Sequence, residues 1–148
     1  MLVTEFNYDD LIIGDKNAIM VAARILSYGK DYEFDLNGFE AIQYTVYNEE
    51  GEQRYDLHMD TILGTDKSMD LPETRKLSLS MVLSDPSEYE GGKFQLQTGS
   101  PEEDKLMTVE QLKGRVIGFP SFLLHRVSPV TKGTRKSLVV WVEGPKFK

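Results

Sequence analysis

The chain has 148 residues, the size of one domain that can bury a core without covalent cross-links. It contains no cysteine, which excludes disulfides, thiolate metal sites, iron-sulfur clusters and cysteine nucleophiles. The net charge of -7 disfavours nucleic acid as a partner, because a polyanion is repelled on average.

Membrane and export signals are missing from the sequence. No apolar run approaches the roughly 20 residues that a membrane helix needs, and the N-terminus carries acids where a secretory signal carries Lys or Arg. We therefore expect a soluble, cytoplasmic protein with no membrane contact. Nothing in the sequence indicates an oligomeric state.

The first 38 residues are predicted to hold one helix and a first strand. Residues 15–28 have a helical pattern, with Asp15 as N-cap and Gly29 where the helix ends. From residue 32 the apolar period changes to two, and Asn37-Gly38 is the strongest short hairpin signal. A β-hairpin is therefore predicted, with its second strand in FEAIQYTVY, residues 39–47.

Six more strand-like segments follow, separated by Asp-Pro, Gly-Gly, Ser-Pro and Lys-Gly breaks. They are RYDLHMD, KLSLSMVL, GKFQLQT, GRVIGFP, SFLLHRV and RKSLVVWV. This pattern predicts a mainly β fold, a jelly roll with one N-terminal helix packed on a sheet. We expect a single domain over residues 1–148, with the jelly-roll core in 39–145.

Two stretches do not have a strand pattern. Residues 61–76 are long for a hairpin connection, so they are either a lid over a site or a solvated loop. Residues 99–113 are either a solvated loop or contain a short helix that begins near Thr108.

The two histidines of the chain, His58 and His125, both lie in strand-like segments. Residues two apart on a strand point to the same side, so His58 and Asp60 present an imidazole and a carboxylate to one face. His125 is the one other imidazole that can complete a metal site. Two imidazoles and a carboxylate leave several metal positions open, which suits iron(II), whereas zinc more often takes a tetrahedral site. Alternatively, each histidine is a hydrogen-bonded core residue.

Arg135 and Ser137 share a strand face that is otherwise apolar, together with Val139 and Trp141. A guanidinium group binds a carboxylate through two parallel hydrogen bonds, and without a partner it would be a costly buried cation. The pattern therefore predicts an anion site, although a surface arginine paired with an acid is the alternative. Tyr47 could donate a hydrogen bond to the same carboxylate or simply fill the core.

Three blocks of sequence resemble the 2-oxoglutarate and iron(II) dependent dioxygenases, in their prolyl 4-hydroxylase-like branch. They are QYTVYNEEGEQRYDLHMD, RKLSLSMVLSDPSEYEGGKFQL and GRVIGFPSFLLHRVSPVTKGTRKSLVVWVEGP, in the order found in the family. Together they fall between residues 39 and 145. The family fold is a double-stranded β-helix, which is the jelly roll expected from the strand pattern.

The resemblance implies a role for each of the residues singled out above. His58, Asp60 and His125 look like the iron ligands, and Arg135 looks like the residue that binds the distal carboxylate of 2-oxoglutarate. Tyr47 aligns with a tyrosine that supports this carboxylate, although one extra residue precedes the His-x-Asp motif here. Ser137 is expected to assist, and Tyr55 and Trp141 are expected to line the pocket or pack beneath it.

The cofactors implied by the resemblance are Fe(II), 2-oxoglutarate and O2, with ascorbate as a reductant. The implied reaction is hydroxylation of a C–H bond with release of succinate and CO2. A protein or peptide side chain is the expected substrate, with proline as the first candidate.

Two alternatives stay open at this point. The first is a nucleic-acid demethylase, against which the acidic balance and the lack of a second arginine shortly after Arg135 both count. The second is a non-enzymatic jelly-roll module in which Arg135 binds a carboxylate ligand.

Overall fold

The computed structural model describes residues 4–7, 34–40, 42–61, 73–97 and 106–146, which form mainly antiparallel β-structure. The seven-stranded sheet contains β1 (Thr4–Asn7), β9 (Arg115–Pro120), β5 (Glu73–Val82), β11 (Val130–Pro145), β2 (Gly38–Phe39), β3 (Gln43–Asn48) and β6 (Tyr89–Gly91). The four-stranded sheet has the order β4 (Tyr55–His58), β10 (His125–Val127), β7 (Phe94–Gln97) and β8 (Leu106–Val109). A 3-10 turn, η2 (Pro86–Glu88), precedes β6. Two antiparallel sheets of this kind are consistent with the predicted jelly roll.

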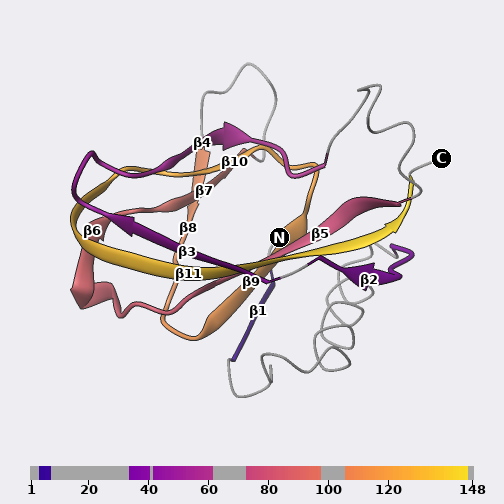
Figure 1. The fold of residues 1–148 in the computed structure, drawn as a ribbon, viewed down its shortest axis with the longest axis horizontal. Coiled ribbons are helices and arrows are strands. Elements are labelled where there is room, and N and C mark those ends of the chain that lie inside the picture. The colour runs from indigo at the N-terminus through magenta and orange to yellow at the C-terminus, as the bar shows by residue number, and fades with distance from the viewer. Residues whose placement is uncertain (1–3, 8–33, 41, 62–72, 98–105, 147–148) are drawn as a thin grey trace.

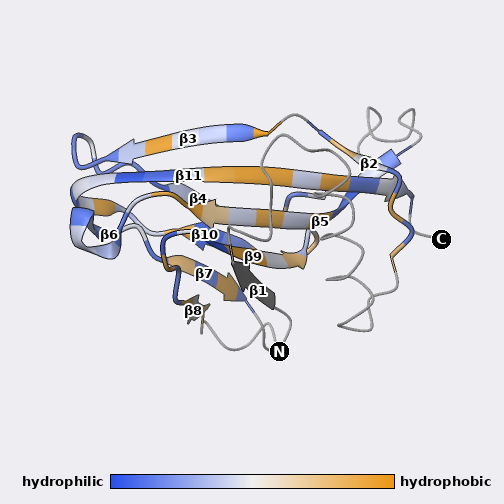
Figure 2. Ribbon diagram, turned by 90° about the horizontal axis from the view of Figure 1, so that it is seen from below, coloured by the Kyte–Doolittle hydropathy of each residue, from blue (hydrophilic) through white to orange (hydrophobic). Residues whose placement is uncertain are grey.

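The 16-residue strand β11 connects most of the larger sheet. It pairs with β5 along its C-terminal part, with β3 along its middle and with β6 at its start. Figure 1 shows it running the length of the molecule, and Figure 2 shows a hydrophobic middle between hydrophilic ends. β11 therefore holds β2, β3, β5 and β6 together in one sheet.

The larger sheet buries side chains on both of its faces. One face carries a core cluster that includes Leu77, Leu79 and Val142. On the other face a second cluster joins the two sheets, with Phe94 of β7 against Phe119 of β9 at a centroid distance of 5.1 Å. The predicted alternation of β11 is confirmed, because Leu138, Val140 and Val142 belong to the first cluster while Arg135, Ser137, Val139 and Trp141 line a pocket on the opposite side.

The predicted N-terminal hairpin is wrong. Residues 34–37 form no strand, and Gly38 does not have the positive φ that an Asn-Gly hairpin turn needs. Instead, the amide of Asn37 donates to the carbonyl of Glu143 and β2 pairs with β11. Burial of Leu36 in the core outweighs the local turn preference. The predicted helix at 15–28 lies outside the described residues.

Neither alternative for the segment around Thr108, a solvated loop or a short helix, is correct for residues 106–109, because they form β8 at the edge of the smaller sheet. Met107 and Val109 pack on the second core cluster, and their spacing of two is that of a strand. The proposed lid over 61–76 lies largely outside the described residues. Its last four residues belong to β5.

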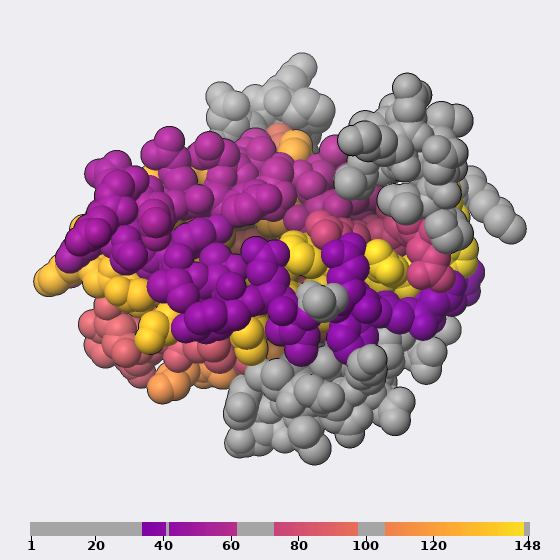
Figure 3. All heavy atoms as spheres, viewed as in Figure 1, coloured from indigo at the N-terminus to yellow at the C-terminus, as the bar shows by residue number. Residues whose placement is uncertain are grey.

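Five of the six later strands are found where the sequence predicted them. The segment SFLLHRV is strand only at residues 125–127, preceded by a turn in which the amide of Leu123 donates to the carbonyl of Pro120. On the face shown in Figure 3, atoms of residues 34–61 lie beside and partly over those of β11. The segment 43–58 contributes one edge strand to each sheet, β3 to the larger and β4 to the smaller. Residues of both strands line the pocket.

Candidate metal and anion site

His58 and His125 lie directly opposite each other on the adjacent antiparallel strands β4 and β10. Their ring centroids are 4.2 Å apart. The Nδ1 of His58 is 2.7 Å from the carbonyl oxygen of Asp56, and the Nδ1 of His125 is 2.7 Å from that of Leu123. A carbonyl oxygen can only accept, so each Nδ1 carries a proton. Each Nε2 faces Asp60, so it donates to the carboxylate when it is protonated and is the atom that can bind a metal ion in place of that proton.

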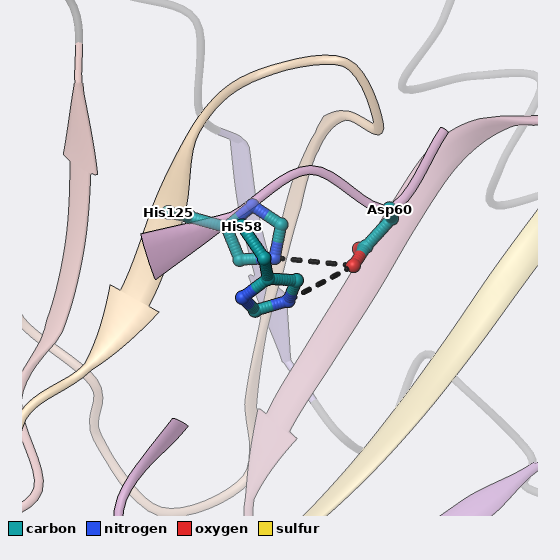
Figure 4. A group of neighbouring side chains, drawn as sticks. All are labelled: His58, Asp60 and His125. Atoms are coloured by element: carbon teal, nitrogen blue, oxygen red, sulfur yellow. Dashed lines mark ion pairs between the residues drawn. The ribbon is translucent and has the colours of Figure 1, made fainter. Parts of the chain in front are cut away.

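Asp60 follows the end of β4 and lies to one side of the two imidazoles, which both point their Nε2 atoms toward it. Its Oδ1 is 3.2 Å from Nε2 of His58 and 3.3 Å from Nε2 of His125, as Figure 4 shows. Its Oδ2 accepts a 2.6 Å hydrogen bond from the hydroxyl of Ser78, and its amide donates to the carbonyl of Ser121. The carboxylate is therefore fixed from both the main chain and the side chain.

The carboxyl group of Asp60 is ionised at any ordinary pH. Burial raises its pKa, since only 6% of the residue is exposed, but hydrogen bonds from His125, His58 and Ser78 lower the pKa more strongly. The net result is a pKa well below the usual value for aspartate. A buried anion is thus available as a ligand.

The three side chains fit a divalent cation. Their ligand atoms all lie within 4.8 Å of one another, and the fixed Nδ1 protons make both Nε2 atoms available as donors. Two imidazole nitrogens and one carboxylate oxygen on one side of an ion form the facial set that non-haem iron(II) uses. All three residues line the same pocket, so an ion that they held would be accessible from it.

Arg135 is almost completely buried at the other end of the same pocket, with 2% of its surface exposed. One guanidinium nitrogen donates to the amide oxygen of Gln111 and the other to the hydroxyl of Ser137, at 3.2 Å. Its Nε has no partner, and within the described part of the chain no carboxylate pairs with the group. Burial lowers the pKa of Arg135, but a guanidinium stays charged in proteins. It is therefore a buried cation with neutral neighbours.

Tyr47 lies directly opposite Arg135 across β3 and β11, and both side chains line the pocket. Burial raises the pKa of Tyr47 despite the opposing effect of the Arg135 charge, so the phenol stays protonated and can donate a hydrogen bond. Ser137, one inward position further along β11, already accepts from Arg135. Tyr55 and Trp141 also line the pocket, which is one of the two positions expected for them.

Sequence reasoning missed several residues that shape the site. Ser78 and Ser121 hold Asp60, and their hydroxyl oxygens are 2.8 Å apart. The alternation in LSLSM, with serines at every second position of a buried strand, was a signal for a polar inner face. Gln111 had no such signal, since it lies in an irregular segment between β8 and β9.

Comparison with known proteins agrees with this geometry. Residues 42–143, more than half of the chain, match the 2OG-Fe(II) oxygenase superfamily. The chain belongs to this superfamily. Membership implies Fe(II), 2-oxoglutarate and dioxygen as the groups that the site takes, and the histidine and aspartate cluster of this chain is suited to iron.

Individual relatives are hydroxylases. A PKHD-type hydroxylase from Pseudoalteromonas atlantica is 34% identical over 99 residues, which is 64% of this chain and 40% of that protein. The viral collagen prolyl hydroxylase of Paramecium Bursaria Chlorella virus-1, solved with 2OG, has a TM-score of 0.65 at 22% identity, covering 96% of this chain and 77% of that one. A prolyl hydroxylase from Trichoplax adhaerens, solved with a hypoxia inducible factor peptide fragment, has a TM-score of 0.59 at 16% identity, covering 95% and 61%.

The chain spans less than half the length of the curated relatives it matches. At these low identities, the solved structures show a shared fold. Among the described residues, no helix is long and apolar enough to cross a membrane.

Proposed function

We propose that this protein is an Fe(II)- and 2-oxoglutarate-dependent dioxygenase that hydroxylates a C–H bond of a protein or peptide side chain, with proline as the first candidate. One observation carries the proposal. A cluster of His58, Asp60 and His125 shares a single pocket with Arg135, a buried cation for which the described residues provide no carboxylate partner. The cluster offers a metal site, and the cation offers a site for an organic acid.

His58, Asp60 and His125 are the proposed metal ligands. The carbonyl oxygens of Asp56 and Leu123 hold each imidazole with Nε2 toward the metal position. The hydroxyl of Ser78 donates a hydrogen bond to Oδ2 of Asp60, which leaves Oδ1 as the oxygen that can bind the metal ion. These contacts fix the orientation of all three ligand side chains.

Arg135 is the proposed partner of the distal carboxylate of 2-oxoglutarate. Along β11 the inward-facing positions run from Arg135 through Ser137 and Val139 to Trp141, and Trp141 lies opposite Ser78, which holds Asp60. A dicarboxylate can thus extend along β11, with one end at the guanidinium and the other at the metal position. Tyr47 donates a further hydrogen bond to the distal end.

The remaining residues of the pocket exclude water and orient the reactants. Phe119 and Phe94 pack against His125, at ring-centroid distances of 4.7 and 5.8 Å. When bound, the iron and its co-substrate supply oxidative decarboxylation to succinate and CO2 and the oxidising power for C–H hydroxylation. The apolar walls then protect this chemistry from competing reaction with water.

The proposed substrate class is supported by the relatives. Two similar folds belong to a collagen prolyl hydroxylase and to a prolyl hydroxylase solved with a peptide. The pocket has an apolar lining with Tyr55 at 47% exposure, so a side chain presented by a peptide can reach the metal position from solvent. An apolar ring such as that of proline suits this lining better than a charged side chain.

Anaerobic titration of the purified protein with Fe(II) and then 2-oxoglutarate tests the proposal. An oxygenase should develop a weak visible charge-transfer band, and admission of O2 should release succinate. Incubation with candidate peptides and ascorbate should then give a mass gain of one oxygen on a side chain. A protein that binds 2-oxoglutarate but shows neither the band nor succinate would be a carboxylate-binding module instead.

A further inference from the structure

Gln111 supports Arg135 from the side away from the metal cluster. It lies between β8 and β9 with 9% of its surface exposed. Its amide oxygen accepts from Arg135 at 2.5 Å, and its amide nitrogen donates to the hydroxyl of Ser80 at 3.4 Å. Arg135 and Ser80 line the pocket that contains the metal cluster, whereas Gln111 lines a second, separate cavity beside Gly92.

The stem of Arg135 is confined as well. A Cβ atom at Gly92 would lie 2.8 Å from the Cδ of Arg135, which is too close. The backbone at Gly92 therefore packs directly against the stem of Arg135, and only glycine fits there. Gly92 also has a φ of 55°, in the region that favours glycine. The guanidinium is therefore fixed by tight packing on its stem and by hydrogen bonds at its head.

All hydrogen-bond acceptors that the described residues give Arg135 are neutral. They are the amide oxygen of Gln111 and the hydroxyl oxygens of Ser137 and Tyr89, and the Nε atom has no partner. A carboxylate in place of the amide would form a stronger, charge-assisted bond and would compensate the buried cation better. If only the stability of the fold mattered, an acid at position 111 would serve better. The neutral amide of Gln111 instead leaves the positive charge of Arg135 available for a ligand.

We propose that Gln111 is a positioning residue for the co-substrate, which orients the Arg135 guanidinium through a neutral hydrogen bond and leaves its charge available for the distal carboxylate. This inference rests on the proposed function, since it assigns Arg135 to 2-oxoglutarate. It makes an unusual prediction for the nearly isosteric change Gln111→Glu. The acid should keep or raise the stability of the fold while it competes with 2-oxoglutarate for Arg135.

The chain offers a matched control for this change. Gln95 on β7 accepts a 2.8 Å hydrogen bond from Arg126 through its amide oxygen, as Gln111 does from Arg135. The pair of Gln95 and Arg126 is exposed and lines neither pocket. Gln95→Glu therefore creates the same type of glutamate–arginine pair outside the site.

The experiment compares wild-type protein with Gln111→Glu, Gln111→Met and Gln95→Glu. Trp141 is the single tryptophan and lines the pocket, so its fluorescence reports 2-oxoglutarate binding to the anaerobic Mn(II)-loaded protein. Urea unfolding gives the stability of each variant, and steady-state succinate release separates KM for 2-oxoglutarate from kcat.

We expect Gln111→Glu to unfold at the same urea concentration as wild type or a higher one. Its Kd for 2-oxoglutarate should rise by about tenfold or more. The kinetic effect should be on KM for 2-oxoglutarate and not on kcat. Gln111→Met should bind it a few-fold more weakly, because the guanidinium loses one support, and Gln95→Glu should bind it normally. If Gln111→Glu does not fold, Gln111→Met carries the test. Normal 2-oxoglutarate affinity in a folded Gln111 variant would overturn the inference and leave the proposed function standing. Absence of 2-oxoglutarate binding and turnover in wild-type protein would instead overturn the proposed function.

Discussion

Tyr47 and Arg135 lie directly opposite each other on β3 and β11, and both side chains face the pocket. They come from strands that are far apart in the sequence, and the phenol stays protonated beside the guanidinium. The pair thus offers one neutral donor and one cationic donor at the same end of the pocket.

Removal of the Tyr47 hydroxyl should weaken co-substrate binding modestly. Tyr47→Phe keeps the ring and removes one hydrogen bond, which is worth about 0.5–1.5 kcal/mol, or roughly 2- to 13-fold in the Kd for 2-oxoglutarate. Tyr44→Phe on the same strand is the control, since Tyr44 is 54% exposed and does not line the pocket. Equal Kd values for Tyr47→Phe and wild type would show that the hydroxyl does not contact the carboxylate.

Loss of the Asp60 carboxylate should abolish tight metal binding. Asp60→Ala removes the single acid of the cluster, so Fe(II) affinity and succinate release should fall together. Asp56→Ala on the same segment is the control, because its side chain is exposed and contacts Arg54. Calorimetric titration with Fe(II) under anaerobic conditions measures the change. Wild-type metal affinity in Asp60→Ala would contradict the ligand assignment.

Neutralising Arg135 should separate co-substrate binding from metal binding. Arg135→Gln removes the charged partner of a carboxylate, which typically costs about 2–5 kcal/mol of binding free energy. The Kd for 2-oxoglutarate should therefore rise by more than an order of magnitude, while Fe(II) affinity stays close to normal. Arg126→Gln, on the exposed face of β10, should change neither quantity. The assignment fails if Arg135→Gln binds 2-oxoglutarate as tightly as wild type.

Removal of the Ser78 hydroxyl should lower the affinity for Fe(II), although Ser78 is not itself a proposed metal ligand. Ser78→Ala leaves Oδ2 of Asp60 without its 2.6 Å hydrogen bond, and loss of such a support typically lowers metal affinity roughly 10- to 100-fold. Ser84→Ala is a matched control, because Ser84 is equally buried but bonds only to backbone groups of Thr134 and Lys136. Both variants should lose similar stability in urea. Only Ser78→Ala should lose Fe(II) affinity, and an equal effect of the two on iron would refute this role.

Much of the strand pattern could be predicted because it is a local property of the chain. Alternation in RKSLVVWV correctly separated the pocket face of β11 from its core face. The failures occurred where long-range packing outweighed local preference. Asn37-Gly38 has the sequence of a hairpin turn, but burial of Leu36 and pairing with β11 hold it in a different conformation. Similarly, residues 106–109 became a strand because β7 offered a partner.

The sequence by itself determined which chemical groups were available: two imidazoles, an aspartate two residues from one of them, and an arginine on an apolar strand. Only the tertiary structure decided that these groups meet, since the pairing of β4 with β10 sets His125 opposite His58, and the pocket-facing side of β11 places Arg135 in the same pocket. It also selected their supports, Ser78 and Gln111. The type of each side chain can be read from the sequence at its own position. The distance between two remote residues cannot, because it depends on how all the strands pair and pack.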